Sequence, residues 1–288
     1  MKTMVTLVRR EFWEHRVFLI APAVMSVLYL ALSLLAGTRF SPTMFVIDGS
    51  ETSLGPAMQP TFYLLLNIVF TMLLYALMAV VVFAYLCDAL YNERKDRSIL
   101  FWKSMPVSDS MTVLSKLLVA LIAVPLVVFA FAFVANVLSF IVFRINFGPV
   151  AVSASDHCAS LDWLHLQALL LMDVLILALW FAPIAAYQLL VSVAVPRAAM
   201  VWTVLPPLIL IFGQRLFFNS WSLAGFTGDR LGGVVRRLPN RDIDGVAGLF
   251  DKANLIELLW LPSLWIGLAA AALMLYVTIR IRRHRDDA

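Results

Sequence analysis

The sequence predicts an all-α membrane protein with six transmembrane helices, and its composition gives the first reason. Of its 288 residues, 62% are hydrophobic and only 14% are charged, and the mean hydropathy is +0.91. Soluble domains are about half apolar and about a quarter charged, so this chain lacks the charges that a water-facing surface needs. We therefore predict an integral membrane protein that forms a single domain over residues 1–288.

Six long apolar stretches give the second reason. A helix of about 20 residues crosses the ~30 Å hydrocarbon core, and continuous apolar runs favour helices over barrel strands, which alternate. The fifth stretch is the shortest and has Pro206 and Pro207 at its centre, which predicts a kink or a broken helix. The predicted spans are 17–38, 62–87, 111–143, 166–195, 198–214 and 258–279.

The chain before the first span, residues 1–16, is predicted to form an amphipathic helix of its own. Its apolar residues recur every three or four positions from Met4 to Phe12, and charged residues occupy other positions of the helical wheel. Such a helix is expected to lie in the inner membrane interface with its apolar face in lipid. The alternative is a basic flank that continues the first transmembrane helix.

Lysine and arginine residues are unevenly divided between the two sides of the predicted bundle. The N-terminus, the 88–116 segment and the C-terminal tail hold most of them, whereas the first two loops on the other side offer only Arg39 and Arg144. By the positive-inside rule, both termini and the 88–116 segment are cytoplasmic. These flanking charges account for the net charge of +4, so no nucleic-acid partner is expected. The outer loop 218–254 is rich in glycine, which favours short helical pieces joined by turns.

Motifs of catalysis and of cofactor binding are missing from the sequence. The four histidines form no HExxH pair, no serine lies in a GxSxG elbow, and there is no GxxxxGK[ST] phosphate-binding loop. Cys87 and Cys158 are far apart in the sequence, so neither a metal site nor a disulfide is expected. We therefore expect no catalytic residue, metal or cofactor in this chain.

Asp173 is the one acidic residue well inside a predicted span. An ionisable group in the membrane costs several kcal/mol and is a candidate for function. In one interpretation Asp173 faces the bundle interior, hydrogen-bonded or protonated; in the other it serves a polytopic membrane enzyme or assembly factor. The uncharged residues Asn67, Asn136 and Gln188 are expected to form hydrogen bonds between helices rather than to bind substrate.

The segment between the second and third spans, residues 90–106, differs from a passive connector. It reads LYNERKDRSILFWKSMP, so acidic and basic residues are followed by apolar ones, by the pair Phe101–Trp102, and by Pro106. Mixed charges suit a specific protein surface, and tryptophan and arginine are enriched at binding hot spots. We expect a protein to dock on this segment. The alternative is that the aromatic pair rests in the membrane interface.

The stretch ERKDRSILFWKSMPVSDSMTVLSK, residues 93–116, resembles the cytoplasmic segment of the bacterial ABC-2 type permeases, the membrane subunits of type V ABC transporters. The layout is similar too: an amphipathic N-terminal helix, six spans, both ends cytoplasmic, and a long loop between the last two spans. The resemblance therefore extends over nearly the full chain, but it names no substrate.

The resemblance implies that residues 90–106 form a coupling helix that inserts into a cleft of a separate ATP-binding subunit, with residues 1–16 as an interface helix beside it. Two such subunits, which bind ATP and Mg, would serve two permease chains, as a homodimer or a heterodimer. The residues implied to face or lock the ATP-binding subunit are Glu93, Arg94, Lys95, Asp96, Arg97, Phe101, Trp102, Lys103, Pro106, Arg9, Arg10, Glu11 and Trp13.

The resemblance also implies an exporter of the cytoplasmic (inner) membrane whose substrate path lies between the two permeases, mainly along spans two and five. A lining of aromatic residues with a few polar points would suit an amphipathic or lipophilic substrate such as a peptide, an antibiotic or a lipid-like molecule. The candidate pathway residues are Asn67, Tyr75, Phe83, Asp173, Trp202, Phe212 and Gln214.

Overall fold

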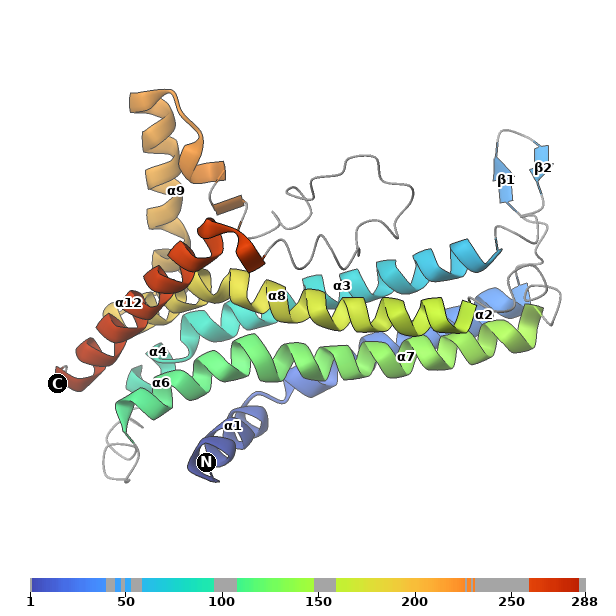
Figure 1. Cartoon of the computed structure of the whole chain (residues 1–288). Helices are drawn as coiled ribbons and strands as arrows, with labels where there is room; N and C mark the ends of the chain where they lie inside the picture. Colours follow the sequence, from blue (N-terminus) through green and yellow to red (C-terminus); the bar gives the residue numbers. More distant parts are fainter. Residues whose placement is uncertain are drawn as a thin grey trace. The chain divides into compact units, whose positions relative to one another are not determined.

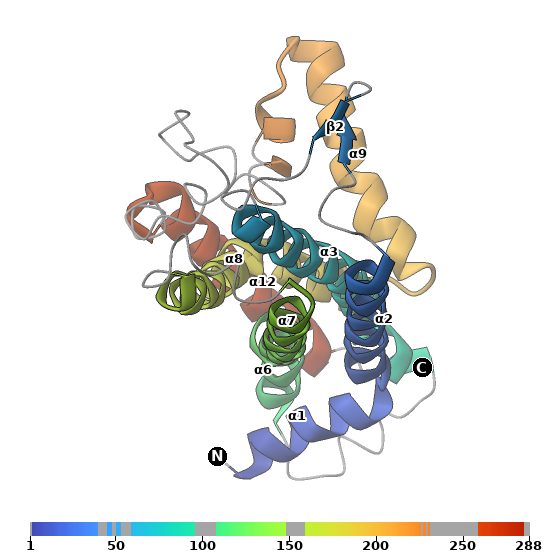
Figure 2. The ribbon, with the colours of Figure 1, turned by 90° about the vertical axis from the view of Figure 1, so that its right-hand side faces the viewer.

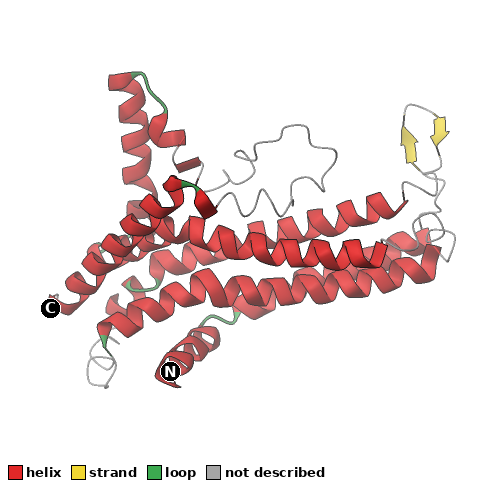
Figure 3. Ribbon diagram, in the orientation of Figure 1, coloured by secondary structure: helices red, strands yellow, loops and turns green. Residues whose placement is uncertain are grey.

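The computed structural model describes residues 2–39, 45–47, 50–52, 59–95, 108–147, 159–225, 227, 228, 230 and 259–284. Nearly all of these residues are helical (Figures 1 and 3). The helices are α1 (Lys2–Glu14), α2 (Val17–Arg39), α3 (Gln59–Asp88), α4 (Tyr91–Lys95), α6 (Asp109–Leu118), the π-helical turn η1 (Val119–Ala123), α7 (Val124–Phe147), α8 (Ala159–Ala194), α9 (Ala199–Phe218) and α12 (Pro262–His284).

Six helical stretches in the described residues are long and apolar enough to cross a membrane, which confirms the predicted fold class. They are Val17–Leu35, Leu66–Lys95, Asp109–Val142, Gln167–Ala194, Ala199–Phe218 and Pro262–His284. The helices extend beyond several of the predicted spans, because polar residues at their ends continue the helix after the apolar run has stopped. The helix α8, for example, begins at Ala159, seven positions before the apolar run that starts at Leu166.

The segment between the first two spans contains a small hairpin that the sequence analysis did not predict. Strand β1 (Phe45–Ile47) pairs antiparallel with β2 (Ser50–Thr52), with Phe45 opposite Thr52. The apolar and β-branched residues of β1 favour a strand, and the sequence between the strands, Asp48–Gly49, is a dipeptide that favours tight hairpins.

Helix α9 continues through Pro206 and Pro207 without a break, so the broken-helix alternative is wrong. Residues in the left-handed conformation stand at both of its ends, Ala198 with φ 54° and Asn219 with φ 48°. Asparagine tolerates this conformation better than most residues. The Asn219 N–H donates to the carbonyl of Arg215 at 3.1 Å, which closes the last turn.

A serine caps the helix at the start of the third span. The Ser108 hydroxyl accepts a hydrogen bond from the Met111 N–H at 3.3 Å and thereby caps α6. The helix then passes through η1, where the Val124 N–H reaches back to the carbonyl of Val119. Such a π-helical turn is rare and inserts extra backbone into an otherwise regular helix.

The chain divides into two compact units. The first consists of Met1–His15, Ala79–Pro125 and Met172–Ala288, and the second of Arg16–Met78 and Leu126–Leu171. The largest side chain that is fully buried in the first unit is Trp180 of α8, and in the second it is Phe18 of α2.

In the first unit, Arg230 lies against α8 and α12. Its guanidinium stands 4.7 Å from the centre of the Trp180 ring and donates to the carbonyl of Ser263. A Cβ added at Gly267 would overlap this guanidinium, so the absence of a side chain at Gly267 makes room for the arginine. Arg230 is 4% exposed.

In the second unit, uncharged polar side chains join three helices, which are seen nearly end-on in Figure 2. The Tyr29 hydroxyl of α2 lies 3.2 Å from Asn67 Oδ1 of α3 and 3.2 Å from Ser139 Oγ of α7. One turn along, Asn136 Nδ2 donates to Thr71 Oγ1 at 3.2 Å. We call these five residues the neutral cluster.

The neutral cluster confirms the predicted interhelical hydrogen bonds of Asn67 and Asn136. Gln188 of α8 behaves differently, because its amide is fully buried and neither of its polar atoms has a hydrogen-bond partner in the described part of the chain. The Tyr29 ring also stacks on Phe70, with ring centres 3.9 Å apart.

Candidate functional site

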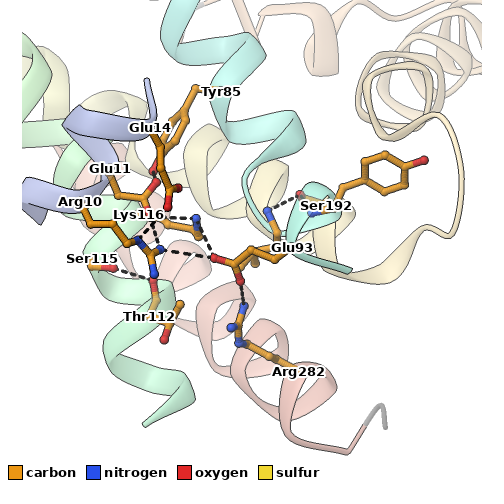
Figure 4. Close-up of polar contacts among 12 residues, drawn as sticks. Arg10, Glu11, Glu14, Tyr85, Glu93, Thr112, Ser115, Lys116, Ser192 and Arg282 are labelled. Carbon is orange, nitrogen blue, oxygen red and sulfur yellow. Dashed lines mark hydrogen bonds and ion pairs between the residues drawn. The ribbon is translucent and has the colours of Figure 1, made fainter. Parts of the chain in front are cut away.

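The most highly charged interior of the described chain lies in the first unit, where α1, α4, α6 and α12 meet (Figure 4). Three carboxylates and three cations interleave there, each ion-paired within this set. We call this set the ionic cluster. Its members are Glu11, Glu93, Asp109, Arg10, Lys116 and Arg282.

Lys116 stands at the centre of the ionic cluster. Its Nζ lies 3.1 Å from Glu11 Oε1 of α1 and 3.0 Å from Glu93 Oε1 of α4, and its side chain is 3% exposed. The spacing of Asp109, Thr112 and Lys116 places all three on one face of α6. Because Ser108 fixes where α6 begins, the local sequence determines which residues form this face.

Arg282 joins the ionic cluster from α12. Its Nη1 donates to Glu93 Oε2 at 2.8 Å and its Nε donates to Asp109 Oδ1 at 3.1 Å. A guanidinium can bind two carboxylates through different nitrogens because its donors form a rigid planar fork. Glu93 therefore has a cation on each of its oxygens, Lys116 on one and Arg282 on the other.

The α1 side of the ionic cluster is held by Arg10 and by a tyrosine. Arg10 Nη2 lies 2.6 Å from Glu11 Oε1 and 3.6 Å from Glu93 Oε1. The Tyr85 hydroxyl of α3 donates to Glu11 Oε2 at 2.8 Å. Both oxygens of Glu11 are therefore bound, which a fully buried carboxylate requires.

These contacts and the burial of this region shift the pKa values of three side chains of α1 and its end, Arg10, Glu11 and His15. Burial acts to raise the pKa of Glu11, but the charge of Lys116 and the hydrogen bond and charge of Arg10 outweigh it, so the pKa lies below its usual value. Burial acts to lower the pKa of Arg10, and the bond to Glu11 reverses this effect. Burial also lowers the pKa of the neighbouring His15. Glu11 and Arg10 are thus charged at neutral pH.

A second anchor holds α4 against the end of α8. Arg94 Nη2 donates to the carbonyls of Ser192 and Val195, both at 2.7 Å. The Ser192 hydroxyl in turn accepts from the backbone N–H groups of Leu90 and Tyr91, both at 3.0 Å. Arginine suits this position because the last carbonyls of a helix lack intrahelical partners.

The structure places the predicted docking residues in different surroundings. Glu11 and Glu93 are buried and bound to cations of the same chain, and Arg94 is bound to α8. Lys95, Arg9 and Trp13 are exposed, and the Arg9 guanidinium lies 4.9 Å from the Trp13 ring centre. Asp96, Arg97, Phe101, Trp102, Lys103 and Pro106 lie outside the described residues. For Glu11, Glu93 and Arg94, the structure thus records contacts within the chain, and docking stays a prediction.

The predicted pathway residues also lie in different parts of the structure. Asn67 belongs to the neutral cluster of the second unit. Tyr75 lies in the same unit, outside that cluster, and is partly exposed. In the first unit, Asp173 is 8% exposed and has no ion pair or hydrogen bond within the described residues. The partly exposed Phe83 belongs to that unit as well.

The remaining pathway residues lie on α9. Trp202 and Phe212 are 50% and 62% exposed. Gln214 instead holds the turn that follows the helix, because its Oε1 accepts from the Leu223 N–H at 2.9 Å and its Nε2 contacts Ser222. A role for any of these residues in a substrate path stays a prediction.

Sequence reasoning missed Lys116, Asp109, Tyr85 and Arg282 as site residues. Charges at the ends of the spans indicate orientation by themselves, but they do not show which of them pair. One signal was available, since Asp109 and Lys116 lie seven positions apart in a helix and share a face. The partners from α1 and α12 are distant in sequence, and no local pattern indicates them.

A metal is not needed to explain this site. In the described part of the chain, ligand atoms of Glu11, Glu14 and His15 lie within 4.8 Å of one another. Glu11 already binds Lys116 and Arg10, and Glu14 binds Arg10 at 3.4 Å. The carboxylates therefore have cationic partners from the protein itself.

These features define a multi-pass helical membrane protein in which buried ion pairs join its N-terminal helix, its last helix and the segment between spans two and three. Residues 56–158 match the family model described as ABC-2 family transporter protein. This match and the six candidate membrane helices support the resemblance to the ABC-2 type permeases. No curated protein and no solved structure matches the chain.

Proposed function

We propose that this chain is the membrane-spanning subunit of an ATP-driven exporter in the bacterial cytoplasmic membrane, and that its substrate is amphipathic or lipophilic. ATP and Mg would be bound by a separate ATP-binding subunit, present in two copies. That subunit would dock on residues 90–106 and move them when it closes on ATP.

The ionic cluster is the observation that supports this proposal best. Glu93 lies three positions before residues 96–107 and Asp109 two positions after them, so both ends of this segment are tied into one buried set of ion pairs. Through the same set, the segment is connected to α1, to α12 and, by Tyr85, to α3. A force applied to the segment would therefore reach these three helices, because packed polar networks resist small deformations.

The same contacts support the predicted orientation. Glu11 near the N-terminus, Glu93 and Lys116 around the central segment, and Arg282 near the C-terminus all meet, so they lie on one side of the membrane. The positive-inside rule assigns that side to the cytoplasm, where ATP is available.

The exposure of α9 supports a second permease chain. Only 6% of its apolar window is buried within the chain, against 50% for α8. An apolar helix with so few partners must face lipid or another protein chain. We propose an identical second permease on this face, with the substrate path between the two chains.

The experiment that tests this function replaces both Phe101 and Trp102 by alanine. Because large apolar side chains dominate binding hot spots, each loss is expected to cost about 2 kcal/mol or more of binding energy. The variant should insert normally but retain far less of the ATP-binding subunit during purification. Trp265→Ala, an exposed tryptophan of α12, is the matched control. Full retention by the double variant would contradict the docking of an ATP-binding subunit on this segment.

A further inference from the structure

Arg282 makes a connection that the proposed function does not by itself require. It lies near the C-terminal end of α12, yet its two partners are 189 and 173 positions away in the sequence. One partner, Glu93, belongs to α4, and the other, Asp109, is the first residue of α6. A single guanidinium thus bridges the two ends of the segment 96–107 (Figure 4 shows its bond to Glu93).

The contribution of Arg282 differs from neutralisation of charge. Glu93 also binds Lys116 at 3.0 Å and lies 3.6 Å from Arg10, so its charge remains compensated without Arg282. Asp109 is 28% exposed at its side chain, so water can solvate its charge. Lys116, which lies on α6, also ties that helix to Glu93, but among the cations of the cluster Arg282 alone binds both Glu93 and Asp109, and it does so from α12.

The geometry requires an arginine. The two bonds leave from Nη1 and Nε, donors held in one plane at fixed separation, so the distance between the two carboxylates is fixed with them. A lysine has one flexible ammonium, which could reach one carboxylate and leave the other free. The Arg282 side chain is 3% exposed, so competition from water is small.

We infer that Arg282 is a positioning residue for coupling: it fixes the spacing of the two ends of the segment 96–107 and makes them move together with α12. This inference rests on the proposed function, because it assigns to α12 a direct part in transmitting the movement of the docked segment. Without Arg282, the two ends would be joined to each other directly only through the ion pair of Lys116 on α6 with Glu93 on α4 in the described part of the chain, and both would lose their ion pairs to α12.

The test uses the full chain with spin labels at Asn92 and Ser110, one on each side of the segment. The distance between the labels is measured by pulsed EPR for the native sequence, Arg282→Gln, Arg282→Lys and the control Arg283→Gln, which changes the exposed neighbouring residue. We expect a narrow distribution for the native sequence and the control, a broad one for Arg282→Gln and an intermediate one for Arg282→Lys. A distance distribution in Arg282→Gln that is as narrow as in the native sequence would overturn the inference. If Arg282→Gln does not fold, a distance distribution in Arg282→Lys that is as narrow as in the native sequence overturns the inference equally.

The second measurement is made with the ATP-binding subunit. We measure how much the permease stimulates its ATP hydrolysis, and whether the two proteins still elute together. In Arg282→Gln the stimulation should fall about tenfold, the factor that corresponds to one charge-assisted hydrogen bond, while the complex stays intact. Unchanged stimulation would overturn the role in coupling even if the distances broaden. Failure of the native chain to bind any ATP-binding subunit would instead contradict the proposed function, and the distances in the isolated permease would still decide the positioning role.

Discussion

The ionic cluster of the first unit and the neutral cluster of the second solve the same problem with different chemistry. Both join helices through buried polar side chains. The ionic cluster uses six charged residues near the ends of helices, whereas the neutral cluster uses hydroxyls and amides of α2, α3 and α7.

The difference follows from where each cluster lies along its helices. Charges deep in a span are costly, and uncharged hydrogen bonds between membrane helices are worth only about 0.6 kcal/mol on average. At helix ends, ions can be paired and partly solvated, and removing one partner of a buried pair costs about 3–5 kcal/mol. The strongest side-chain connections between helices are therefore expected at the end that carries the segment 90–106.

The largest effect is expected from Lys116→Met, which removes the cation shared by Glu11 and Glu93 while keeping most of the side-chain volume. The loss should be about 3–5 kcal/mol, because two buried carboxylates lose a partner. The midpoint of thermal unfolding in detergent is the measurement, and Lys95→Met, at an exposed lysine of α4, is the matched control. Equal stability of the two variants would show that the ionic cluster contributes little to holding the helices together.

Acid is expected to have the next largest effect, through Glu11 of the ionic cluster and through the neighbouring His15. The pKa of Glu11 is lowered on folding, so its contribution is complete above the ordinary value of 4.5 and is lost as the pH falls through the lowered value. The pKa of His15 is also lowered on folding, which adds a separate loss of stability that begins as the pH falls through its ordinary value of 6.5 and ends at the lowered value. Unfolding midpoints measured from neutral to acid pH should show both steps.

Two variants test whether Glu11 causes the more acidic step. Glu11→Gln should be less stable at neutral pH and should lack the more acidic step, whereas Glu14→Gln, at a half-exposed side chain, should retain it. The neutral cluster contains only hydroxyl and amide groups, which do not titrate in this range. Persistence of the acidic step in Glu11→Gln would assign it to other carboxylates.

The smallest effect is expected from Asn67→Leu, in the neutral cluster. The substitution removes the amide oxygen that accepts from Tyr29 and Ser139, and the expected cost is about 0.6–1.7 kcal/mol. Ser33→Ala is the control, because the Ser33 hydroxyl bonds to Leu30 of its own helix. A loss as large as that of Lys116→Met would remove the contrast between the two clusters.

The sequence predicted those parts of the fold that depend on local composition. The six spans follow from continuous apolar runs. The hairpin at 45–52 was missed because three-residue strands give too short a pattern to recognise. The ionic cluster was missed for a different reason: its pairs join residues of four helices, and the position of α1 and α12 beside α6 is decided by tertiary packing.

The absence of a side chain at Gly267 has a consequence for the evolution of this chain. Any side chain at that position would occupy volume that the Arg230 guanidinium now holds, so the guanidinium would have to leave its present place. Among descendants of a common ancestor, replacement of the glycine should be accompanied by loss of the arginine, and a collection of sequences in which the two vary freely would show that this contact is dispensable.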